Sequence, residues 1–186
     1  NYRGLFFFLA WRDILVRYKQ TVIGVAWSVL RPLLTMLILV IVFDKLAKLP
    51  AGGLPYPILV FAAVLPWQLF ANGLTESSNS LVVNANILSK VYFPRLIMPT
   101  SAVIVTLVDF LVSFALLLLL MTLYQFPFSW RMLTLPVFIA LAVLATLGCG
   151  YWLSALNVKY RDFRHVVPFI SQIGLYISPV GFSSDI

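Results

Sequence analysis

The stretch from Leu96 to Leu123, LIMPTSAVIVTLVDFLVSFALLLLLMTL, decides the fold class. Its 28 residues include a single charged side chain, Asp109. A helix rises about 1.5 Å per residue, so about 20 apolar residues cover the roughly 30 Å hydrocarbon core of a bilayer. The stretch therefore predicts a helix that crosses a membrane.

The composition places the rest of the chain in lipid as well. Of its 186 residues, 62% are hydrophobic and 10% are charged, whereas soluble globular domains have about 45–50% apolar and about 25% charged residues. One cysteine, Cys149, and one histidine, His165, provide no ligand set for a metal centre. The sequence lacks a phosphate-binding P-loop and the H-E-x-x-H and G-x-S-x-G motifs of hydrolases. We therefore predict no catalytic residue, no metal site and no cofactor in this chain.

Four other stretches are predicted as spans, at residues 25–43, 56–74, 133–156 and 166–182. The last is the weakest, because Pro168 lies within it and Pro179 lies near its end, where a missing N–H breaks or bends a helix. The sequence thus predicts an all-α polytopic integral membrane protein, with one transmembrane domain over residues 1–186 and five transmembrane helices (96–123 being the third). Since the sequence begins at Asn1 and stops at Ile186 within a motif, we expect a longer natural chain with a further C-terminal part.

The basic residues divide unequally between the two sides of these spans. Nine precede the first span or follow the second and fourth spans, namely Arg3, Arg12, Arg17, Lys19, Lys90, Arg95, Lys159, Arg161 and Arg164. Three lie in the alternate loops, namely Lys45, Lys48 and Arg131. Cytoplasmic loops carry an excess of Lys and Arg, so the N-terminus is predicted to be cytoplasmic. The net charge of +7 is interpreted as a topology signal rather than as a nucleic-acid-binding surface.

Residues 1–22 show the periodicity of an amphipathic helix. Apolar side chains recur on one helical face, at Phe7, Trp11, Ile14, Leu15 and Tyr18. Polar side chains project from the other face, at Arg12, Asp13, Arg17 and Gln20. Such a helix lies in the membrane surface with its polar face toward the cytoplasm. It can be a lipid anchor alone, or its polar face can also dock a cytoplasmic partner.

Two charged residues lie within predicted spans, where charge is costly. Asp109 must face protein or water, and we interpret it as a hydrogen-bonded packing residue, because one acid alone makes a poor proton pathway; a proton relay or a substrate contact is the alternative. Arg31, in the first span, can extend its charge to the interface. In the fourth span a stripe of small residues predicts close packing against another helix, of this chain or of a second copy. The stripe consists of Ala142, Thr146, Gly150 and Ser154.

Three motifs resemble those of one family. They are RDILVRYKQTVIGVAW at 12–27, followed by Pro32; NANILSKVYFPRLIMP at 84–99; and NVKYRD at 157–162, leading to SPV at 178–180. In order and spacing they resemble the permease subunits of type 2 ABC exporters, in particular exporters of O-antigen, capsule and teichoic-acid polymers. The resemblance covers nearly all of the chain. One departure is Arg31, where the family more usually has a neutral polar residue before the proline.

The resemblance implies a multi-pass protein of the bacterial cytoplasmic membrane that exports a lipid-linked glycan. It implies six spans in the full chain, a second copy of the permease, and two copies of a separate cytoplasmic ABC ATPase subunit, which binds ATP and Mg. Membrane lipid is a further partner, and nucleic acid is not. Residues 76–95 are expected to form the coupling segment that sits on the ATPase. The expected contact residues are Arg12, Arg17, Leu81, Asn84, Asn86 and Lys90.

Aromatic side chains suit a path for sugar rings, because their faces pack against the C–H faces of pyranoses without trapping them in fixed hydrogen bonds. The candidates are Trp27, Trp67, Phe70, Trp152 and Tyr176. The alternative is that each of these side chains faces lipid or the protein core.

Two other functions stay open. The nearer is the same architecture exporting a drug or a simple lipid, which predicts a narrower path. The more distant is a membrane enzyme that acts on polyprenyl-linked sugars, which requires acids or histidines clustered at one membrane face.

Overall fold

A computed structural model describes residues 2–19, 24–46, 55–90, 92–127 and 130–177. All regular secondary structure in these ranges is helical, as the composition predicts. The α-helices are α1 (Tyr2–Lys19), α2 (Gly24–Val40), α3 (Tyr56–Val83), α4 (Ala85–Leu88), α5 (Ile97–Leu123), α6 (Leu135–Lys159) and α7 (Phe163–Ile177). A π-helical turn (Ile41–Leu46) extends α2, and a 3₁₀ turn (Trp130–Thr134) precedes α6.

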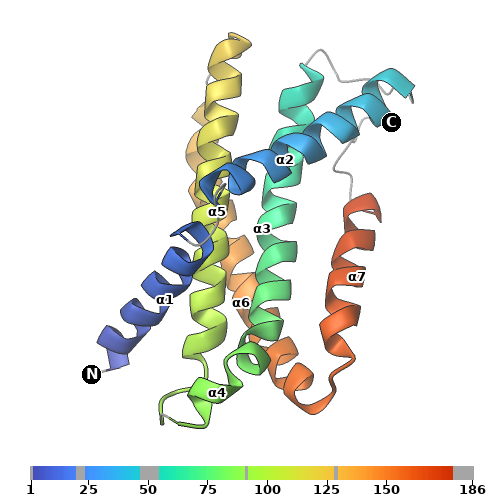
Figure 1. The fold of residues 1–186 in the computed structure, drawn as a ribbon. Helices are drawn as coiled ribbons and strands as arrows, with labels where there is room; N and C mark the ends of the chain where they lie inside the picture. The colour runs from blue at the N-terminus through green and yellow to red at the C-terminus, as the bar shows by residue number, and fades with distance from the viewer. Residues whose placement is uncertain (1, 20–23, 47–54, 91, 128–129, 178–186) are drawn as a thin grey trace.

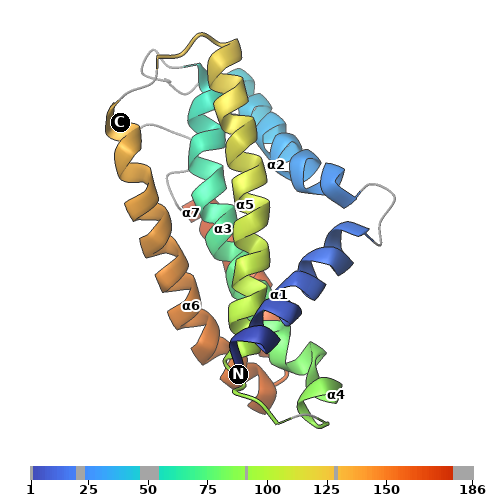
Figure 2. The same ribbon diagram turned by 90° about the vertical axis from the view of Figure 1, so that its left-hand side faces the viewer.

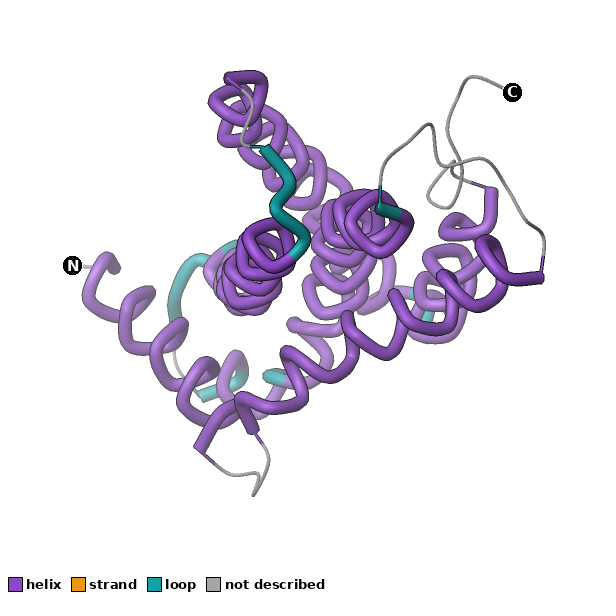
Figure 3. Tube along the Cα trace, turned by 90° about the horizontal axis from the view of Figure 1, so that it is seen from above, coloured by secondary structure: helices purple, strands orange, loops and turns teal. Residues whose placement is uncertain are grey.

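Helix α3 is the centre of the arrangement (Figure 1). It packs along α5 and α6, while α7 lies on a further side of it. Helix α2 crosses α3 and α5 obliquely, and α1 rests on α5 (Figure 2). The view from above shows these helices grouped around α3, with α1 and α2 along one flank (Figure 3). Helix α4 and the start of α1 lie at the same end of the bundle.

Three helical stretches of the described chain are long and apolar enough to cross a membrane: Tyr56–Val83, Ile97–Leu123 and Met132–Lys159. They correspond to the second, third and fourth predicted spans. The helices at the first and fifth predicted spans are shorter, with 17 residues in α2 and 15 in α7. The end of the fifth predicted span, residues 178–182, lies outside the described residues.

Helix α3 continues nine residues past the predicted end of its span at Leu74, so the expected coupling segment 76–95 begins inside α3. Hydropathy falls after Leu74 because the next residues are polar, but the hydroxyls of Thr75, Ser78 and Ser80 bond to carbonyls of the same helix. Thr75 donates to Ala71 O at 2.9 Å and Ser80 donates to Ser77 O at 2.7 Å. Satisfied in this way, hydroxyl side chains are compatible with helix. The polar end of α3 is therefore a rigid extension of the span.

The small-residue stripe of α6 packs on α3 of the same chain. Thr146, Gly150 and Ser154 are buried on this side of α6. At Gly73 of α3, an added Cβ atom would lie 2.5 Å from Thr146 Cγ2. At the far end of the seam, the Asn157 amide donates to Ser78 O at 2.9 Å and to Asn79 Oδ1 at 3.0 Å. Because Gly73 and Gly150 have no side chains, the backbones of α3 and α6 approach closely. The hydrogen bonds of Asn157 fix the register of the two helices.

We expect Gly150→Ala to loosen this seam. A Cβ atom at position 150 would meet Ser77 Cβ at 2.9 Å, and Ser77 is fully buried on α3. Overpacking of this kind costs about 1–3 kcal/mol. The matched control is Gly148→Ala, because nothing lies within 4 Å of a Cβ atom there. Thermal unfolding of the purified protein in detergent should show a clear loss for Gly150→Ala alone; equal melting temperatures for both variants would contradict the seam.

Candidate functional site

The cytoplasm-predicted end of the bundle is a compact corner made by α1, the end of α3, α4 and the start of α5. Its apolar core consists of buried Leu9, Phe93 and Met98, with Leu81, Ile87, Leu88 and Ile97 packed against them. The three buried residues come from α1, from the α4–α5 connection and from α5. Leu81, one of the expected ATPase contacts, packs against this core. Burial of the apolar surface of Ile87 and Leu88 holds α4 against the bundle.

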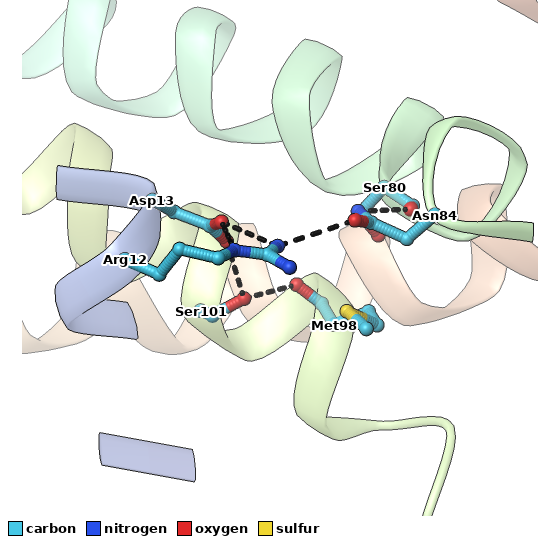
Figure 4. Close-up of polar contacts among 6 residues, drawn as sticks. All are labelled: Arg12, Asp13, Ser80, Asn84, Met98 and Ser101. Carbon is cyan, nitrogen blue, oxygen red and sulfur yellow. Dashed lines mark hydrogen bonds and ion pairs between the residues drawn. The ribbon is translucent and has the colours of Figure 1, made fainter. Parts of the chain in front are cut away.

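A polar network ties α1 to this corner (Figure 4). Arg12 pairs with Asp13 at 2.6 Å and donates to Asn84 Oδ1 at 3.3 Å. Asn84 in turn donates to Ser80 O at 2.9 Å, at the end of α3. On the other side, the Ser101 hydroxyl of α5 contacts Asp13 Oδ2 at 3.4 Å. The network therefore joins α1 to both α3 and α5.

This network shows which groups the polar face of the helix meets within the chain. The apolar Trp11 is 62% exposed, whereas the side chain of Arg12 is 31% exposed and turned toward α3. The periodicity identifies two faces of the helix, but it does not identify what each face meets. Exposed apolar side chains are stable in lipid, and the polar face satisfies its hydrogen bonds on α3 and α5. Gln20, assigned to the polar face, lies outside the described residues.

The end of α1 is tied to the middle of α5 through Asp109. Arg17 Nη2 lies 3.0 Å from Asp109 Oδ2, and the Tyr18 hydroxyl donates to Asp109 Oδ1. Arg17 also lies 3.7 Å from Glu76 of α3. These contacts supply the hydrogen bonds that the packing interpretation of Asp109 requires. Sequence reasoning missed Tyr18 as a partner, because its ring falls on the apolar face and only its hydroxyl reaches α5.

The outer surface of the corner carries both predicted and unpredicted exposed side chains. Asn86 and Lys90 are exposed, as a contact surface requires. Val83 and Tyr92 are exposed as well, and Tyr92 is 96% exposed. Exposed tyrosine rings such as that of Tyr92 are common anchors in protein interfaces. The sequence signal for Val83 and Tyr92 was their position near Asn86 and Lys90 in the chain.

A cavity of about 530 Å³ lies between the end of α1, α2, α3 and α5. Its polar wall comes from four helices and includes Arg17, Arg31, Gln68, Asn72, Thr106 and Asp109. Its apolar wall includes Trp27, Leu34, Ile38 and Leu69. The cavity therefore brings together both charged residues predicted within spans and one of the predicted path aromatics.

The other path aromatics are dispersed over the structure. Trp67 and Phe70 are neighbours on α3, with ring centroids 6.1 Å apart, and Trp67 packs against α7 at Gly174. Trp152 is exposed on α6. The side chain of Tyr176 is not among those described. The described side chains thus do not form one continuous aromatic surface within a single copy.

The long apolar helices, the lipid-compatible face of α1 and the satisfied charge inside the bundle define an integral membrane protein. The chain matches the ABC-2 type transporter family over residues 4–186 and belongs to that family. It is 32% identical over 182 residues to the O-antigen export system permease protein RfbA of Myxococcus xanthus, covering 97% of this chain and 68% of that protein. It is 30% identical over 176 residues to a Klebsiella pneumoniae protein of the same name, covering 94% of this chain and 67% of that protein.

Proposed function

We propose that the chain is the membrane-spanning permease subunit of an ATP-driven exporter that moves a lipid-linked polysaccharide of the O-antigen, capsule or teichoic-acid type across the bacterial cytoplasmic membrane. The observation that carries this proposal is the similarity to proteins named O-antigen export permeases over nearly the whole chain. ATP and Mg are bound by a separate cytoplasmic subunit, two copies of which serve a permease homodimer.

The proposed orientation places the α4 corner in the cytoplasm, with five spans in this part of the chain. The bias of basic residues supports it. Helix α3 is long enough to carry the corner out of the hydrocarbon, because its 28 residues measure about 42 Å and exceed a core of roughly 30 Å. Counted from the outer end at Tyr56, the polar residues after Leu74 then lie beyond the hydrocarbon.

The corner is the proposed coupling element. Lys90, Asn86 and the exposed Tyr92 face outward from it and form the proposed ATPase contact. The contact between Arg12 and Asn84 couples movement of α4 and the end of α3 to α1. The ion pair between Arg17 and Asp109 couples movement of α1 to the middle of α5. Arg12, Arg17, Asn84 and Leu81 thus act inside the permease, as the parts that move with the contact surface.

The aromatic residues stay the proposed contacts for sugar rings along the path. Trp27 is the best supported of them, because it is exposed and lines the cavity beside Arg31. The others are Trp67, Phe70, Trp152 and Tyr176. In a dimer, side chains on separate faces of one copy can meet those of the second copy, which is consistent with their dispersion here.

The test is export by the full-length permease with its own ATPase subunit in a strain that synthesises the polymer and lacks a permease. We expect polymer at the cell surface only when both subunits are present and the ATPase is active. Accumulation of polymer inside the cell, together with efflux of small amphiphiles, would contradict the proposal and favour the drug or simple-lipid exporter.

A further inference from the structure

The cavity between α1, α2, α3 and α5 contains one cationic group, Arg31, for which the described residues provide no acidic partner. Arg17, the other cation in its wall, is paired with Asp109, whose second oxygen accepts from Tyr18. Within the described part of the chain, no carboxylate lies within ion-pair distance of Arg31. The lining thus has two cations and one anion, and its net positive charge is located at Arg31.

Neutral hydrogen-bonding groups surround this charge. Thr35 lies one turn along α2, and Gln68 Nε2 reaches Thr35 Oγ1 at 3.5 Å. Asn72 lies one turn farther along α3 and also lines the cavity. A guanidinium and amide donors together recognise phosphate oxygens, because hydrogen bonds from a charged donor to an anionic oxygen are about twice as strong as neutral ones.

An apolar strip leads away from Arg31 along α2. Leu34, Ile38 and Ile41 follow at helical spacing on one face and are all exposed, with Ile38 56% exposed. Leu34 and Ile38 line the same cavity. The surface therefore has a cationic end and a hydrocarbon-compatible continuation, which matches an amphiphile with an anionic head and an apolar chain.

The depth of the cavity agrees with this ligand. Asn72 lies 16 residues from the outer end of α3, or about 24 Å along the helix, and Asp109 lies about 21 Å from the outer end of α5. In a core of roughly 30 Å, Asn72 and Asp109 then lie in its cytoplasmic half, about 6 Å and 9 Å short of the boundary beyond which lipid phosphates lie.

We propose that this cavity binds the phosphate group of a lipid, with Arg31 as the anion contact and the Leu34–Ile38 strip against the lipid chain. The phosphate can belong to a membrane phospholipid or to the polyprenyl anchor of the carried glycan. Only the second source rests on the proposed function. The cavity then presents the lipid end of the cargo beside Trp27, a proposed sugar contact.

The experiment titrates the full-length permease, purified with its ATPase, with phosphatidylglycerol, undecaprenyl phosphate or inorganic phosphate, and counts bound molecules by native mass spectrometry. Arg31→Gln should weaken binding of the lipid phosphates by about tenfold, the value of one charge-assisted hydrogen bond. Arg31→Lys should retain most of the affinity. Arg161→Gln, which removes an exposed charge from the α6–α7 turn, is the matched control and should bind as the unmodified protein does.

Equal binding by the Arg31→Gln and Arg161→Gln variants would overturn the site, as would inorganic phosphate competing as strongly as the lipids. Tighter binding of undecaprenyl phosphate than of phosphatidylglycerol would support the glycan anchor, and the reverse order would support a membrane phospholipid. Failure of the unmodified permease to export polymer, with Arg31-dependent lipid binding intact, would overturn the proposed function and leave the site standing.

Discussion

Replacement of Lys90 by Glu is expected to reduce ATP-driven polymer export at least tenfold while the permease remains in the membrane. Lys90 is exposed at the corner and makes no ion pair within the described chain, so its charge is available to a partner. Reversal of a charge at a protein contact places like charges together, which costs several kcal/mol. Export and stimulation of the partner ATPase, measured together in reconstituted vesicles, should both fall.

Asn86→Trp provides a second test of the same surface by bulk rather than by charge. It should also uncouple export from ATP turnover, because Asn86 is exposed beside Lys90 on the same corner. Arg164→Glu is the control, since Arg164 is an exposed basic residue on α7, which is not one of the helices that form the corner. Unchanged export and ATPase stimulation in Lys90→Glu and Asn86→Trp would refute the coupling role of the corner.

Asp109→Leu is expected to lower the amount of folded permease and to destabilise it by about 1–2 kcal/mol. The change leaves Arg17 without its partner, and loss of one member of a fully buried pair costs 3–5 kcal/mol. The smaller value applies because the side chains of Arg17 and Asp109 are 33% and 21% exposed. Asp109→Asn should be tolerated, since its amide oxygen can accept from Arg17 while its NH2 group donates to the Tyr18 hydroxyl oxygen.

A double-mutant cycle measures the interaction between Arg17 and Asp109 separately from the other effects of each substitution. Arg17→Met keeps the apolar stem of the side chain and removes its charge. Combined with Asp109→Leu, it should cost clearly less than the sum of the two single changes, because each removes the same interaction. Additive losses would show that Arg17 and Asp109 do not act together, and abolition of a proton-dependent export by Asp109→Asn would favour the proton relay over the packing role.

Composition and hydropathy predicted the all-helical fold and the positions of α3, α5 and α6, because lipid solvation restricts a chain of this kind to helices. Their limits appear at the end of α3. A hydropathy profile ends the span at Leu74, whereas the hydroxyls of Thr75 and Ser80 bond within the helix and let it continue to Val83. Intrahelical bonding of side chains is invisible to hydropathy.

The candidate site was predicted in part, for a related reason. Periodicity predicted two faces of α1, but the partners of the polar face are Asp109, Asn84 and Ser101, which are distant in sequence. The stripe at Gly150 indicated close packing without identifying α3 as its partner. The position of Asn86 and Lys90 on the exposed surface was accessible to sequence reasoning, because both lie in a polar connection between two apolar spans.

The side of the membrane on which the α4 corner lies is the most direct test of the coupling proposal. In a full-length permease from which Cys149 and any other native cysteine have been removed, Lys90→Cys provides a single thiol at the corner. A membrane-impermeant maleimide should label this thiol in inverted vesicles and leave it unlabelled in intact cells. Labelling of the thiol at position 90 from outside intact cells would contradict the cytoplasmic corner and the coupling that depends on it.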